Sequence, residues 1–204
     1  MLKKISRKRF LEKYPNFIQA SYYKNKYVIP ETYENYILGV EWKSTTGLCS
    51  SIAKEASKLL RILGYEELFF LGDTTTPWLF REHDYAPVKK ALEYLAENKI
   101  SKSFNGAIRV KMDDFPEFMR HLFWLVRCNG IVIYAHFSDA GFNIIASICQ
   151  YGNIHLSTLN EEADGALNDA LFLTNFFEVP DGQCGGGRVY KRYATSIQRK
   201  PAFC

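Results

Sequence analysis

The hydrophobic pattern changes from a helical to a strand-like period part-way along the chain, and this change restricts the fold more than any other feature. Beyond Gly130, short apolar runs occupy residues 131–137, 142–149 and 153–159. The connections between them, residues 138–141 and 150–152, are short enough for antiparallel hairpins, whereas a parallel crossover needs a dozen or more residues. The segment 131–159 therefore predicts a β-meander.

Helical periodicity dominates the preceding part of the chain. In residues 45–63 apolar side chains recur at three- and four-residue steps, and Gly64 follows as a C-terminal cap. Further helices are expected over residues 86–98, from Asp113 or Asp114 onward, and over residues 160–172. Short apolar runs at residues 66–71 and 104–111 predict strands between these helices. The pattern predicts an α+β fold with helices packed on a mainly antiparallel sheet.

The chain shows no internal repeat and no linker before about residue 180, so a single α+β domain over residues 1–204 is expected. Residues 1–40 are rich in basic and aromatic side chains and are expected to form an arm or a lobe. Three consecutive glycines, residues 185–187, begin a basic tail that extends to residue 204.

Cysteine usage and hydropathy indicate the environment of the protein. The five cysteines are odd in number, widely spaced and without a C-x-x-C pair, which argues against a disulfide framework and a structural zinc site. No run of 18 apolar residues occurs, and the basic first residues lead into no apolar signal segment. We expect a cytoplasmic protein without a membrane span.

The net charge of +4 is unevenly distributed along the chain. Residues 1–30 carry +7 and residues 185–204 carry +5, which leaves −8 on residues 31–184. Basic ends around an acidic body are compatible with nucleic acid, with a charged protein partner or with simple solvation. Both ends also interleave basic and aromatic residues, as in 22–27 and 188–193, a pattern compatible with stacking on bases and contact with phosphates.

Cys49 is the sharpest catalytic candidate in the sequence. It lies in the first turn of the helix predicted over residues 45–63, where the positive end of the helix dipole favours a thiolate. Residues 47–55 resemble the nucleophile helix of papain-like and transglutaminase-like thiol enzymes. This resemblance implies a hydrolase or acyltransferase with His136 or His155 as the base and Asp139 or Asn153 as its orienting group. The alternative interpretation is that Cys49 is simply a small residue at a helix start. The histidines are then strand residues that face solvent or a neighbouring side chain.

No metal site and no cofactor are predicted. The four histidines fall on four different predicted elements, so no metal-ligand spacing is visible. The glycine-rich segment 181–188 lacks the ending of a phosphate-binding loop and does not lie between a strand and a helix. It is interpreted as a turn.

A compact α+β chain without a complete catalytic motif is typical of proteins that act through their surface. In general character it resembles bacterial toxin-immunity proteins, most closely in residues 114–159. The resemblance implies a cytoplasmic inhibitor that binds a cognate toxin domain and occludes it. Carboxylates would then face a basic cleft, and the charge pattern suggests Asp113, Asp114, Glu161, Glu162 and Asp164. A nucleic-acid-binding accessory protein is the third possibility, and the oligomeric state stays open.

Overall fold

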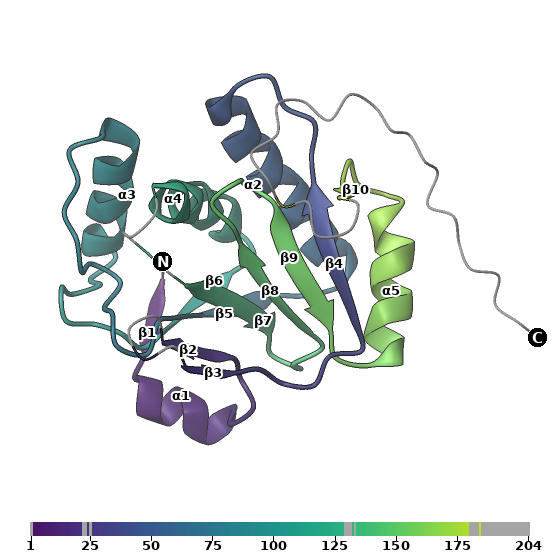
Figure 1. The fold of residues 1–204 in the computed structure, drawn as a ribbon, viewed down its shortest axis with the longest axis horizontal. Helices are drawn as coiled ribbons and strands as arrows, with labels where there is room; N and C mark the ends of the chain where they lie inside the picture. Colours follow the sequence, from purple (N-terminus) through teal and green to yellow (C-terminus); the bar gives the residue numbers. More distant parts are fainter. Residues whose placement is uncertain are drawn as a thin grey trace, which may run out of the picture.

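The computed structural model describes residues 2–21, 24, 26–128, 132, 134–179 and 184. It confirms the predicted α+β class. Within these residues, five helices accompany an eight-stranded antiparallel sheet with the order β1-β6-β5-β7-β8-β9-β4-β10, and β2 and β3 form a separate hairpin (Figure 1). The basic tail, residues 185–204, lies outside the described residues.

The bounds of the elements follow the sequence pattern closely over most of the chain. The strands of the large sheet are β1 (Lys3–Ile5), β6 (Ala107–Lys111), β5 (Glu67–Gly72), β7 (Ala135–Asp139), β8 (Ile144–Ile148), β9 (Ile154–Thr158), β4 (Glu34–Gly39) and β10 (Phe177–Glu178). The hairpin consists of β2 (Gln19–Ser21) and β3 (Lys26–Val28). The helices are α1 (Arg7–Lys13), α2 (Thr45–Ile62), α3 (Ala86–Glu97), α4 (Phe115–Arg127) and α5 (Glu161–Leu171).

The β-meander is confirmed as β7, β8 and β9, which pair in sequence order. Strand β7 begins at Ala135, later than expected from the apolar run 131–137. The turn from β7 to β8 is held by Asp139, whose carboxylate accepts hydrogen bonds from the backbone N–H groups of Gly141, Asn143 and Ile144. This side chain therefore organises a hairpin turn.

Helix boundaries are fixed by the caps that the sequence suggests. Asn160 precedes α5 and accepts a hydrogen bond from the backbone N–H of Ala163, as expected for an N-cap. Ser44 caps α2 in the same way through the N–H of Gly47. Asp114 occupies the N-cap position of α4 without a side-chain capping bond. Among the described residues, none of the helices combines the length and the apolar character needed to cross a bilayer.

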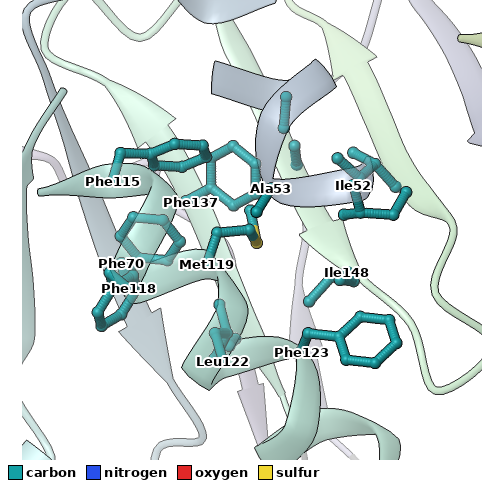
Figure 2. Close-up of a cluster of buried hydrophobic side chains, with 14 of the residues drawn as sticks. Ile52, Ala53, Phe70, Phe115, Phe118, Met119, Leu122, Phe123, Phe137 and Ile148 are labelled. Atoms are coloured by element: carbon teal, nitrogen blue, oxygen red, sulfur yellow. The ribbon is translucent and has the colours of Figure 1, made fainter. Parts of the chain in front are cut away.

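Most of the core lies between one face of the sheet and helices α2 to α5. We call this the helix-side core. Helix α4 packs against α2, α3 and β6, which agrees with its apolar character around much of its circumference. Figure 2 shows the aromatic part of the helix-side core. The ring centroid of Phe70 lies 4.7 Å from that of Phe118 and 4.9 Å from that of Phe137. Rings at this separation contribute beyond simple burial.

The opposite face of the sheet has two different parts. Over β5 and β6, helix α1 packs Phe10 against Phe69, and Phe17 and Ile18 complete a smaller apolar cluster (Figure 1). Over β7, β8 and β9, the same face carries Ile145, which joins this cluster, and otherwise polar side chains. Because successive side chains of a strand point to opposite faces, each of these three strands serves the core on one side and a polar surface on the other.

Strand β4 lies in a tyrosine-rich region, residues 22–42, whose sequence favours loop and short strand over helix. In the structure it enters the large sheet between β9 and β10 and pairs with β9 from Glu34 to Leu38. This pairing joins segments more than 100 residues apart. Such a partner is decided by packing of the completed sheet and leaves no local signature in the sequence.

Candidate functional site

Three polar side chains line up across the meander on the face opposite the helix-side core. The register pairs His136 of β7 with Ser147 of β8, and Ser147 with His155 of β9. Their neighbours along each strand are buried in the helix-side core, namely Ala135, Phe137, Ala146, Ile148, Ile154 and Leu156. Alternation therefore directs the two imidazoles and the hydroxyl to the other face, which we call the polar face.

Two cysteines approach His155 on the polar face. The sulfur of Cys184 lies 3.2 Å from Nε2 of His155 and 3.2 Å from the sulfur of Cys149. The three ligand-type atoms all lie within 4.8 Å of one another. Asn153 adds a hydrogen bond from its Nδ2 to the sulfur of Cys184 at 3.4 Å. Two thiols and an imidazole thus form one compact cluster.

The turn between β8 and β9 explains how Cys149 reaches this cluster. The backbone N–H of Cys149 donates to the carbonyl of Asn153, and the N–H of Gly152 donates back to the carbonyl of Cys149. Gly152 has a φ of +87°, a conformation that favours glycine. This tight turn leaves Cys149 and His155 at adjoining positions on the polar face.

In the sequence, Cys149 follows an apolar run, which favours a place in the core. The structure corrects this, since Cys149 is half-buried and lies outside the helix-side core. The reason is again alternation, because Ile148 takes the core-facing position at the end of β8.

The environment favours the uncharged forms of these groups. Burial and the hydrogen bond with Cys184 raise the pKa of Cys149 to about 11. Burial lowers the pKa of His155, and burial together with the neighbouring His155 lowers the pKa of His136 to about 4. A neutral imidazole offers a lone pair, so His155 can act as a metal ligand.

A groove of about 320 Å³ opens beside the cluster, over β4, β9 and β10. His155 contributes to its wall together with Asn35, Ser157 and Glu178. The hydroxyl of Ser157 donates to Oδ1 of Asn35 at 2.6 Å, which fixes both polar groups along the groove. The cluster therefore borders a space large enough for water or a small ligand.

The structure does not bring Cys49 together with His136 or His155. Cys49 belongs to the helix-side core, whereas both histidines are on the polar face of the sheet. Its thiol lies 3.5 Å from the carbonyl oxygen of Arg120 and donates to it. Burial raises the pKa of Cys49 to about 11, and the opposing charge of Arg120 has the smaller effect, so the thiolate is disfavoured.

The two proposed orienting residues also have other partners. The carboxylate of Asp139 holds the β7–β8 turn and, by alternation from Phe137, belongs to the side of the sheet away from His136. Asn153 lies in the β8–β9 turn and contacts Cys184. Cys49 itself lines a separate pocket of about 370 Å³ that also includes His121, whose ring stacks on Tyr94.

The five carboxylates suggested for partner binding fall into two groups. Asp113, Glu161 and Glu162 are exposed, and Asp113 forms an ion pair with Arg61 at 3.0 Å. Asp114 is half-buried at the start of α4. Asp164 accepts hydrogen bonds from the hydroxyls of Tyr36 and Thr158, so it braces α5 against the sheet.

Sequence reasoning did not find the cluster of Cys149, His155 and Cys184. Cys184 is 29 residues beyond His155 in a segment interpreted as a turn, so no motif spacing links them. The alternation of β8 and β9 was the available signal, because it places Cys149 and His155 on one face. Comparisons of the chain with protein-family models, curated proteins and solved structures gave no match.

Proposed function

We propose that this chain is a cytoplasmic inhibitor, of the toxin-immunity kind, that binds a basic protein partner through carboxylates gathered at one end of the sheet. The observation that carries the proposal is the strand register. It brings exposed acidic residues from four separate chain segments to the same end, which we call the carboxylate end. Its members are Glu34, Glu66, Asp113, Glu161 and Glu162.

The register can be followed strand by strand. Glu34 begins β4 opposite Thr158, where β9 ends shortly before Glu161 and Glu162. Thr158 is also opposite Ile144 at the start of β8. The β7–β8 turn continues this edge, because Asp139 at the end of β7 is opposite Leu68 near the start of β5.

The edge ends at β5 and β6. Glu67 is opposite Lys111, so Glu66 and Asp113 follow at the same end of the sheet. The positions between Glu34 and Asp113 thus form one continuous edge. A partner with a basic cleft would meet several carboxylates at once.

Apolar anchors accompany these charges. Tyr33 is 51% exposed directly before β4, and its backbone N–H donates to the carbonyl of Thr158 at the same edge. Ile62 is exposed in the last turn of α2, next to the Arg61 that pairs with Asp113. Interfaces draw most of their affinity from a few such anchors, while surrounding charges give orientation and fast association.

Inhibition would result from occlusion of the partner. An acidic surface opposite a basic cleft raises the association rate by about 10- to 1,000-fold at low salt. No chemistry by the inhibitor is required. The carboxylate end supports this function without a catalytic residue.

The test compares two variants with the same change of net charge. One carries Asp113→Lys, Glu161→Lys and Glu162→Lys at the carboxylate end. The matched control carries Glu12→Lys, Glu41→Lys and Asp84→Lys, three exposed carboxylates on α1, beyond the other end of β4 and before α3. Each protein is immobilised and exposed to nuclease-treated lysate of the source cells, and the retained proteins are then expressed alone and together with the chain.

The parent and the matched control are expected to retain a basic protein that the carboxylate-end variant does not retain. That protein should arrest growth when expressed alone and become harmless when the parent chain is present. Equal retention by both charge variants, or growth arrest that co-expression does not relieve, would overturn the proposal. In a parallel capture from untreated lysate, retention that is absent after nuclease treatment would indicate the nucleic-acid-binding class instead.

A further inference from the structure

We propose that Cys149, His155 and Cys184 bind a zinc ion, with a fourth coordination position directed toward the groove beside His155. The proposal is independent of the carboxylate end. It rests on three ligand atoms from separate parts of the chain that meet on the polar face of the sheet.

The spacing of the ligand atoms is close to that of a zinc site. Around a tetrahedral zinc ion, with bonds of about 2.3 Å to sulfur and about 2.0 Å to nitrogen, ligand atoms are about 3.5–3.8 Å apart. The two separations that involve Cys184 are both 3.2 Å, and all three atoms lie within 4.8 Å of one another. To admit the ion, Cys184 must move outward by a few tenths of an ångström, and the Cys149 and His155 atoms must settle at about 3.5 Å from each other, inside their present limit of 4.8 Å.

The chemistry of the ligands selects the metal. Thiolate sulfur is a soft ligand, and two thiolates with one imidazole suit zinc, whereas magnesium and calcium prefer oxygen ligands. Asn153 donates a hydrogen bond to Cys184, and the backbone N–H of Cys149 is held by the carbonyl of Asn153. Such supporting contacts orient ligands and strengthen metal binding.

Three protein ligands leave one position of a tetrahedron for water or another small ligand. His155 connects the cluster with the groove of about 320 Å³, whose other polar groups include Ser157 and Glu178. The fourth position is therefore reachable by a small molecule. An ion at this place would act as a Lewis acid toward a polar group in the groove.

The full chain is tested in a reducing buffer, so that both cysteines are thiols at the start. Zinc is titrated against a competing chromophoric chelator, and Co²⁺ is used as a spectroscopic probe. We expect one zinc per chain. The Co²⁺ form is expected to show a thiolate-to-metal charge-transfer band and the intense visible bands of tetrahedral coordination.

Each ligand is then removed separately through Cys149→Ser, His155→Ala and Cys184→Ser. Each is expected to lower zinc affinity by at least about 100-fold, because second-shell changes alone cost 10- to 100-fold. Cys128→Ser and His121→Ala are the matched controls, since both residues are also half-buried but lie outside the cluster. These controls should bind zinc as the parent does.

The Co²⁺ spectrum of the parent keeps the test decisive even where a variant folds poorly. Absence of the charge-transfer band, less than one zinc per reduced chain, or equal losses in the ligand and control variants would each overturn the assignment. A Cys149–Cys184 disulfide that persists in the reducing buffer would also overturn it, because it would remove two of the three ligands.

Discussion

Replacement of Asp139 by alanine should lower the free energy of unfolding, because the carboxylate of Asp139 has a structural role. Its carboxylate is buried at the end of β7 and accepts four hydrogen bonds at 2.7–3.2 Å, three from backbone N–H groups and one from a side-chain amide. The donors come from Gly141, Asn143 and Ile144. The β7–β8 turn therefore depends on one side chain.

The size of the effect follows from what each donor can do when the carboxylate is lost. The N–H of Ile144 makes its bond in a buried position, and an unpaired buried donor costs about 1–3 kcal/mol. The other three donors are only partly buried and can turn to water, at roughly 0.5–1 kcal/mol each. Together these give a loss of about 2.5–6 kcal/mol for Asp139→Ala.

Urea unfolding followed by circular dichroism measures this loss. Asn143→Ala is the matched control, because it removes one bond to the same carboxylate and should cost about 1 kcal/mol. Asp139→Asn should fall between the two, since the amide keeps one acceptor oxygen. A loss below about 1 kcal/mol for Asp139→Ala would refute the assignment of the turn to this carboxylate.

Two further predictions concern groups inside the helix-side core. Burial alone would raise the pKa of Glu55, but hydrogen bonds from the backbone N–H and the side chain of Asn175 outweigh it and hold this pKa below the ordinary 4.5. The ionised carboxylate therefore stabilises the fold above pH 4.5, and this contribution is lost as the pH falls through the lowered pKa. In urea unfolding, Glu55→Gln should lower the free energy of unfolding by about 1–2 kcal/mol at neutral pH and by clearly less near pH 3.5. A loss that is independent of pH would contradict this. Cys49, with a pKa raised from 9.0 to about 11, carries about 100-fold less thiolate at neutral pH, so iodoacetamide should label it slowly in the folded protein and rapidly in urea. Rapid labelling near pH 6 that His136→Ala or His155→Ala slows would favour the thiol-enzyme interpretation instead.

Local features of the fold could be predicted because their causes are local. The helix over residues 45–62 follows from its apolar spacing and from Gly64 after its end, and α5 begins after the capping residue Asn160. The meander follows from period-two runs joined by connections too short for a crossover. Each of these signals lies within a window of about 20 residues.

Long-range features could not be predicted in the same way. The place of β4 beside β9 and the approach of Cys184 to His155 both depend on segments far apart in the sequence. Composition even pointed away from a metal site, because the cysteines lack paired spacing. A cluster assembled from a strand, a turn and a distant segment becomes visible only when the register of the sheet is known.

The geometry of the thiol and imidazole cluster is set by the core on the other side of the sheet. A Cβ at Gly152 would lie 2.7 Å from Leu48 and 3.0 Å from Phe123, so the β8–β9 turn presses directly on α2 and α4. This contact fixes the turn that holds Cys149, and Ile154 anchors the start of the strand that carries His155. A well-packed core deforms little, because each displaced group loses its contacts. Two of the three proposed zinc ligands are therefore positioned by the core before any metal binds.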